Sequence, residues 1–153
     1  MYLKAVKYVS GYDFKEGSNE NRLAVMNIMR NADLPATLLC DEAPSVEVSF
    51  NIAYWRKANC IHNWFVKNVQ GGVDECQVSP VSREQLETLR DLCEKVLVER
   101  DASLLPPKSG FFFGSTDVDD WYWSDVAKTA KALRVILDAP DLKVCELAYR
   151  ASW

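Results

Sequence analysis

Apolar and polar residues alternate most regularly in the segment that follows Pro44. The apolar positions there are Val46, Val48, Phe50 and Ile52, and the polar positions between them are Glu47, Ser49 and Asn51. A period of two residues is typical of a strand with one buried face. Looser alternation at residues 2–9 and 144–151, and an aromatic run at 110–113, predict three further strands.

Four other segments repeat their apolar residues with the spacing of an α-helix. They cover residues 22–31, with Leu23, Met26 and Met29; residues 54–70; residues 83–98; and a stretch from about residue 119 to Pro140. The third begins with a Ser82-to-Gln85 capping box. The fourth carries Val126, Ala130, Leu133 and Leu137 at helical spacing. Gly71 and Gly72 are expected to end the second helix.

These elements predict an α+β fold, with a small, mostly antiparallel sheet and helices packed on one of its faces. The 153 residues suit one domain, and neither an internal repeat nor a linker divides them, so we expect a single domain over residues 1–153. The order of the strands and the oligomeric state do not follow from the pattern.

Composition narrows the classes of function. A net charge of −4 provides no general attraction for the phosphates of duplex nucleic acid. The apolar runs are shorter than the roughly 18 residues of a membrane span, and the N-terminal residues lack a signal-peptide pattern, so we expect no membrane association. Five scattered cysteines without a C-x-x-C pair predict free thiols in a cytosolic protein.

The densest chemical segment is residues 54–65, which hold two tryptophans and the only histidine. On a continuous helix, Trp55, Asn59 and His62 form one stripe beside the core, and Arg56 belongs to a polar stripe. Aromatic rings next to amides at such a boundary suit a planar ligand or a peptide. The alternative is structural, with Trp55 packed at the edge of the core and His62 bonded to a loop carbonyl.

The same helical geometry argues against catalysis by this segment. Cys60 and His62 are two residues apart and therefore about 200° apart around a helix, so they do not form a nucleophile and base pair. One histidine without clustered thiols does not indicate a zinc site. We therefore expect no cofactor, and a binding protein is favoured over an enzyme.

A second segment, residues 109–117, places three phenylalanines between Gly110 and Gly114 and ends in a hydroxyl-rich turn. Phe112, Ser115 and Thr116 are its candidate binding residues. The acidic residues Asp117, Asp119 and Asp120 that follow are explained either by capping of the next helix or by a magnesium site. Three aromatic residues then start that helix, and because they cannot all face the core, we expect an exposed anchor there, Trp121.

The chain resembles a family of small bacteriophage and prophage proteins. The likeness rests on the starting Met1–Leu3, on the YWRKANxIHxWFVxNVQ motif at residues 54–70, on SGFFFGST at 109–116, and on the final Ala-Ser-Trp. Similar proteins often have tyrosine where Val118 stands here. The resemblance implies an accessory protein in the bacterial host cytosol, without a defined mechanism.

These observations lead to three expected functions. The first is a non-enzymatic protein that engages or inhibits a host bacterial protein, such as an antiviral defence component, through the Trp55, His62 and Phe112 region. The second is a nucleotide sponge or a small nucleotide-acting enzyme that uses Arg56, Asn59 and Ser115. The third is a structural or oligomer-forming role. A deep pocket with these side chains favours a small ligand, and a flat aromatic patch favours a protein partner.

Overall fold

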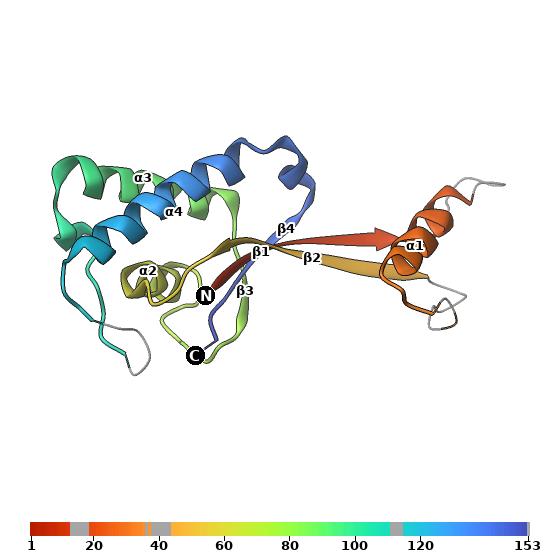
Figure 1. Ribbon diagram of the computed structural model, residues 1–153, viewed down its shortest axis with the longest axis horizontal. Helices are drawn as coiled ribbons and strands as arrows, with labels where there is room; N and C mark the ends of the chain where they lie inside the picture. The colour runs from red at the N-terminus through yellow and green to blue at the C-terminus, as the bar shows by residue number, and fades with distance from the viewer. Residues whose placement is uncertain (13–18, 36, 38–43, 111–114, 153) are drawn as a thin grey trace. The chain divides into compact units, whose positions relative to one another are not determined.

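The structure is a computed structural model that describes residues 1–12, 19–35, 37, 44–110 and 115–152. Its elements, in chain order, are β1 (Tyr2–Ser10), α1 (Glu20–Asn31), β2 (Ser45–Tyr54), α2 (Asn59–Asn68), β3 (Val78–Pro80), α3 (Arg83–Glu99), η2 (Ala102–Leu104), α4 (Asp120–Asp138), η3 (Pro140–Val144) and β4 (Glu146–Arg150) (Figure 1). The four strands form one sheet in the order β2-β1-β4-β3.

The expected α+β class with a small antiparallel sheet is confirmed. Strand β3 pairs with β4 in antiparallel register, with Ser79 opposite Tyr149. This edge strand is absent from the sequence prediction because three residues that end in a proline leave too little alternation to detect. The aromatic run predicted as a strand at 110–113 lies outside the described residues, apart from Gly110, which is not in a strand.

The chain divides into two compact units. The first unit contains Met1–Ala5 and Asn51–Trp153, and the second contains Val6–Phe50. The first unit holds α2, α3, α4, β3 and β4 together with residues 2–5 of β1 and 51–54 of β2. The second holds α1, residues 6–10 of β1 and residues 45–50 of β2.

The core of the first unit is made by α2, α3 and α4 against one face of the sheet. On the sheet, the buried side chains are Leu3, Ala5, Leu147 and Tyr149, and the residues that alternate with them are more exposed. The Phe65 ring of α2 stacks on the Tyr149 ring at a centroid distance of 3.9 Å and an angle of 6°. Helix α2 is therefore fixed to the middle of the sheet by aromatic packing.

The two helices predicted over residues 83–98 and from about residue 119 to Pro140 are confirmed as α3 and α4. The Ser82 side chain accepts a hydrogen bond from the Gln85 amide, and the Gln85 side chain accepts one from the Ser82 amide, which is a complete capping box. The apolar positions expected in α4 are buried: Val126, Ala130, Leu133 and Leu137. Helix α3 buries Leu86, Leu89, Cys93 and Val96. The two helices pack on each other along much of their length (Figure 1).

The second unit contains α1 with residues 6–10 of β1 and residues 45–50 of β2. Helix α1 buries Val25 and Met29, whereas Leu23, an expected core residue, is about half exposed. Near the end of β1, the Gly11 amide donates to the Pro44 carbonyl at 2.6 Å. A Cβ on Gly11 would lie 2.8 Å from that oxygen, so the close approach of the two segments requires glycine.

Within the part of the chain that the structure describes, no helix combines the length and the apolar character that a bilayer crossing requires.

Candidate functional site

The segment at residues 54–58 is not helical, which corrects the expectation of one helix from Tyr54 onward. Strand β2 continues to Tyr54, and α2 begins only at Asn59. The backbone of Trp55 pairs with Met1 through two hydrogen bonds of 3.0 Å, one in each direction. This pairing extends the sheet past the point where the sequence pattern predicts a helix, so the expected stripe of Trp55, Asn59 and His62 does not form.

Trp55 is buried and does not stand at an exposed boundary. Its indole Nε1 donates a 2.8 Å hydrogen bond to the Thr129 hydroxyl of α4, and Thr129 in turn donates to the Asp125 carbonyl. The Trp55 ring also lies 5.8 Å from the Phe65 ring. Trp55 therefore joins β2 to α4, and the expectation of a partly exposed side chain is wrong.

His62 is also buried, with 3% of its surface exposed, inside a cluster that we call the His62 cluster: His62, Tyr149 and Asp74. Its Nδ1 lies 2.7 Å from the Tyr149 hydroxyl, and its Nε2 lies 2.9 Å from an Asp74 carboxylate oxygen. Burial, with the Asp74 charge as a smaller cause, raises the pKa of Tyr149 and keeps its hydroxyl protonated. Tyr149 then donates to Nδ1, and the Nε2 hydrogen goes to Asp74.

Asn59 connects the two segments that the sequence marks as chemical. It is buried at the start of α2, and its Nδ2 donates a 2.7 Å hydrogen bond to the Ser115 carbonyl. Asn59 therefore lies against the second segment. The Ser115 hydroxyl is engaged in its own turn, where it donates to the Asp117 carboxylate and accepts from the Asp117 amide. Phe112 lies outside the described residues.

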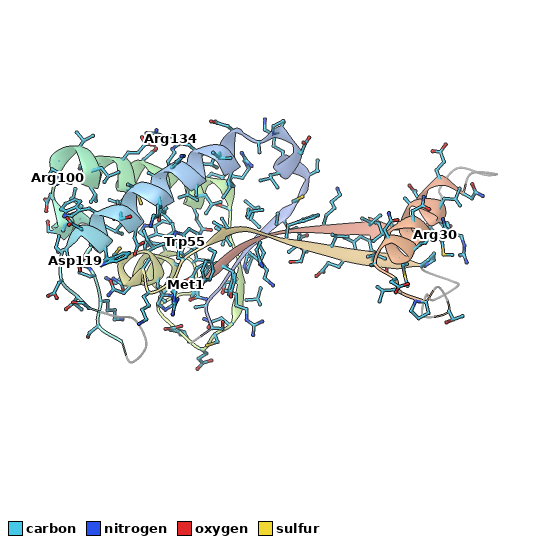
Figure 2. All side chains as sticks on the ribbon, in the orientation of Figure 1. Met1, Arg30, Trp55, Arg100, Asp119 and Arg134 are labelled. Carbon is cyan, nitrogen blue, oxygen red and sulfur yellow. The ribbon has the colours of Figure 1, made fainter. Side chains whose placement is uncertain are left out.

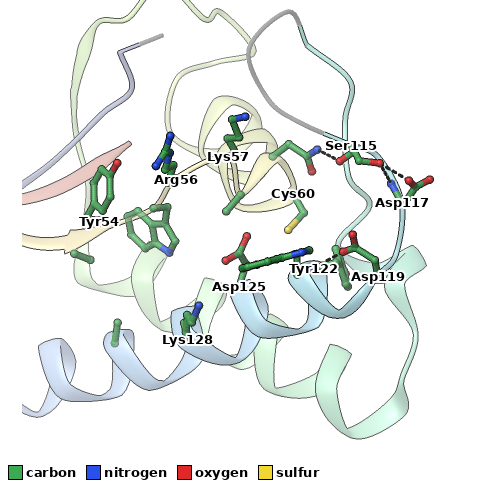
Figure 3. Close-up of a pocket in the computed structure, with 16 residues that line it drawn as sticks. Tyr54, Arg56, Lys57, Cys60, Ser115, Asp117, Asp119, Tyr122, Asp125 and Lys128 are labelled. Carbon is green, nitrogen blue, oxygen red and sulfur yellow. Dashed lines mark hydrogen bonds between the residues drawn. The ribbon is translucent and has the colours of Figure 1, made fainter.

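An open cavity of about 700 Å³ lies where these segments meet the first turns of α4 (Figure 3). We call it the cleft. Five of the eight predicted binding residues line it: Trp55, Arg56, Asn59, Ser115 and Trp121. His62 does not line the cleft; it borders a separate cavity of about 240 Å³ together with Asp74. Thr116 is exposed but lies outside the lining of either cavity.

The charged side chains of the cleft are separated by sign. Figure 3 shows Arg56 beside Tyr54 at one end and Asp117 and Asp119 beside Ser115 at the other, with Asp125 between them. Lys57 and Lys128 complete the basic lining. The cleft therefore offers three cations and three carboxylates, with an acidic and a basic end.

Trp121 is the exposed member of the three aromatic residues that start α4. It is 75% exposed, whereas Tyr122 is buried and its hydroxyl donates to the Leu105 carbonyl at 3.0 Å. Trp123 is half-buried, with the Arg100 guanidinium 4.3 Å from its ring centroid. The expectation that at least one of the three faces outward is confirmed.

Asp125 and Cys60 face each other across the cleft, as Figure 3 shows. Burial raises the pKa of the Cys60 thiol to about 12, so the sulfur stays protonated and is a poor nucleophile. Burial also raises the pKa of Asp125, an effect that Lys128 opposes and Asp119 reinforces. The Asp125 carboxylate forms neither a hydrogen bond nor an ion pair with any described side chain or amide.

Sequence reasoning missed Tyr54, Lys57, Asp125 and Lys128 as residues of the cleft. For Asp125 a signal existed, because it follows Trp121 by four residues and so shares its face of α4. For Tyr54 and Lys57 the signal was obscured by the expected helix. Asp119 accepts a 3.0 Å hydrogen bond from the Tyr122 amide, which confirms the capping explanation for this residue.

Among the described residues, no group of three histidine, cysteine or acidic side chains is arranged to hold a metal ion. Comparisons with protein-family models, with curated protein sequences and with solved structures gave no match to this chain. The site therefore has to be interpreted from its own chemistry.

Proposed function

We propose that this protein is a binding protein that takes a short segment of a partner protein into the cleft. The observation that carries the proposal is Trp121, a large aromatic side chain that is 75% exposed and lines a cavity of about 700 Å³. Tryptophan is one of the residue types enriched among those that dominate the binding energy of protein interfaces.

The charges of the cleft support a peptide as ligand. Its acidic and basic ends suit a chain segment with charged side chains of both signs, since complementary charges fix the register of a bound segment. The resemblance to bacteriophage proteins extends the proposal to the partner, which would be a protein of the bacterial host, such as a defence component that this chain inhibits.

A nucleotide is the second candidate, because Arg56, Asn59 and Ser115 line the same cleft. An arginine, an amide and a hydroxyl are suitable partners for a phosphate and a base. The three carboxylates of Asp117, Asp119 and Asp125 oppose this candidate, because they repel the negative charge of a phosphate chain. Since three cations and three carboxylates line the cleft, it has no net positive charge to hold a phosphate chain, which favours a peptide with charges of both signs.

Binding without catalysis fits the state of the reactive side chains. The Cys60 thiol is held protonated, and the His62 ring is buried with both nitrogens engaged by Tyr149 and Asp74. A nucleophile requires a base that can reach it, and His62 lies outside the lining of the cleft.

The test is affinity capture from a bacterial lysate with the wild-type protein and two variants. Trp121→Ala removes the proposed anchor, and Val135→Ala is the matched control, because Val135 is 65% exposed on the same helix and does not line the cleft. We expect a protein captured by the wild type and by Val135→Ala but lost with Trp121→Ala. Purified partner then has to bind the wild type directly in calorimetry. Capture that is equal with all three proteins would contradict the proposal, and a copurifying nucleotide would favour the second candidate.

A further inference from the structure

We propose that the cleft recognises an arginine side chain of the bound segment, with the guanidinium held by the Asp125 carboxylate and stacked on the Trp121 ring. This inference rests on the proposed function, because it names the group that the partner presents. Asp125 and Trp121 are four residues apart on α4, so both lie on the face that borders the cleft.

The first support is the state of the Asp125 carboxylate. It is half-buried, and among the described residues it has neither a hydrogen-bond donor nor an ion-pair partner. A carboxylate that has lost part of its hydration without gaining a partner is destabilised, and a cation that enters the cleft removes that penalty. The nearest cation on its own helix, Lys128, is close enough to act on the carboxylate's charge but forms no ion pair with it.

The second support is the ring beside the carboxylate. An arginine guanidinium is planar, donates two parallel hydrogen bonds to one carboxylate and stacks on an indole face. Trp121 has most of its surface free for such stacking. A lysine ammonium offers a point charge without the planar face, so this pair of residues discriminates in favour of arginine.

The other charged groups of the cleft set the direction of the bound segment. Arg56 and Lys57 repel a second basic group at their end and attract an acidic one, whereas Asp117 and Asp119 add to the attraction for the guanidinium near Trp121. The recognised segment is therefore an arginine with an acidic residue on one side of it.

The experiment is a titration of the full chain, observed by NMR, with N-acetyl-arginine amide and with its neutral isostere N-acetyl-citrulline amide. The sequence has five tryptophans, and the indole signal that disappears in the variant Trp121→Phe is assigned to Trp121. We expect the arginine probe to move the Trp121 signal and to bind about tenfold more tightly than the citrulline probe, as suits the loss of one charge pair. The lysine derivative is expected to bind more weakly than the arginine derivative.

Asp125→Asn is expected to abolish the preference for arginine over citrulline. The matched control is Asp138→Asn, which makes the same change in net charge at the end of α4, outside the cleft. Equal binding of arginine and citrulline, tighter binding of lysine, an unmoved Trp121 signal, or a preference that survives Asp125→Asn would each overturn the inference.

The two proposals fail in different ways. If Trp121→Ala abolishes capture of a partner but the arginine probe does not bind, the partner-binding function stands and the arginine assignment falls. If the arginine probe binds at Trp121 and Asp125 but Trp121→Ala leaves capture unchanged, the arginine site stands and the cleft is not the surface for that partner.

Discussion

The His62 cluster and the cleft both border the first turn of α2, and they differ in whether their polar side chains have partners. In the His62 cluster, both ring nitrogens of His62 have partners, Tyr149 and Asp74, at 2.7 and 2.9 Å. In the cleft, Asp125 and Arg56 have no hydrogen-bond or ion-pair partner among the described residues, and Trp121 projects into open space. Figure 2 shows the described side chains as sticks, with Trp55 of the first unit labelled. Groups that satisfy each other stabilise the fold, whereas unpaired groups in a cavity are available to a ligand.

The largest effect is expected from Phe65→Ala, which removes the ring under Tyr149. Phe65 is fully buried and stacked on Tyr149, so its truncation leaves a large cavity beside the His62 cluster. We expect a loss of about 3–5 kcal/mol in the free energy of unfolding, measured by urea denaturation. A loss below about 1 kcal/mol would show that the core can collapse around the gap and that α2 is not fixed by this contact.

His62→Ala is expected to destabilise the protein by about 1–3 kcal/mol for each buried group left without its partner. The buried group that would lose its partner is the Tyr149 hydroxyl, which donates to His62 Nδ1. A binding assay distinguishes the His62 cluster from the cleft. At a temperature where the His62→Ala variant stays folded, it should still bind the arginine probe. If the His62→Ala variant keeps full stability and loses binding of the arginine probe, the His62 cluster would be the binding site and its structural role would be contradicted.

Trp121→Ala should have the opposite profile. Because its side chain is mostly exposed, its loss is expected to change the free energy of unfolding by no more than about 0.5 kcal/mol. Binding of the partner should be lost. A thermal melt together with calorimetry separates these outcomes, and a large loss of stability would move Trp121 from the binding surface to the structural residues.

Asp125→Asn is expected to stabilise the unliganded protein at neutral pH. The folded state raises the pKa of this carboxyl, so the folded protein holds its proton more tightly than the unfolded chain. The stability that this group contributes is present below the unfolded pKa of about 3.9 and is lost as the pH rises through the higher folded pKa. The gain from the substitution should therefore appear at pH 7 and vanish below the unfolded pKa. Equal melting temperatures at pH 7 would show that water or Lys128 already compensates the charge.

The smallest expected effect is a difference in the reactivity of the cysteine thiols, which depends on burial and is measured without any substitution. Cys60 and Cys93 are buried, and burial raises the pKa of each thiol to about 12, whereas Cys76 and Cys145 are partly accessible. In a native thiol titration we expect Cys76 and Cys145 to react well before Cys60 and Cys93. All five thiols of the sequence should react once the protein is denatured.

The sequence predicted those elements whose signals are local. The period of α3 and α4 and the capping box at Ser82 depend on residues within a few positions of each other, and the structure confirms them. The end of β2 was mispredicted because Trp55 pairs with Met1, 54 residues away. The burial of His62 was missed for the same reason, since Tyr149 lies 87 residues further along the chain.

The candidate site was predicted in part, for a similar reason. The abundance of aromatic and amide residues identified five residues of the cleft, because composition is visible in any short window. The sign-separated charges were not predicted, since Arg56, Asp119 and Asp125 come together only when α4 lies against the start of α2. Contacts between residues that are far apart in the sequence decide which polar side chains have hydrogen-bond partners. The pattern of residues within a short segment does not contain that information.

The sheet order has a consequence for how the protein is made on the ribosome. Strand β1 precedes the other three strands in the sequence and lies between β2 and β4, whereas β4 follows all of them in the sequence. The edge of β1 that pairs with β4 therefore stays unpaired until β4 has been synthesised, and this pairing joins segments that are far apart in the sequence. Nascent chains stalled before residue 146 should lack the buried side chains of Leu147 and Tyr149, so the core can be completed only after β4 has left the ribosome.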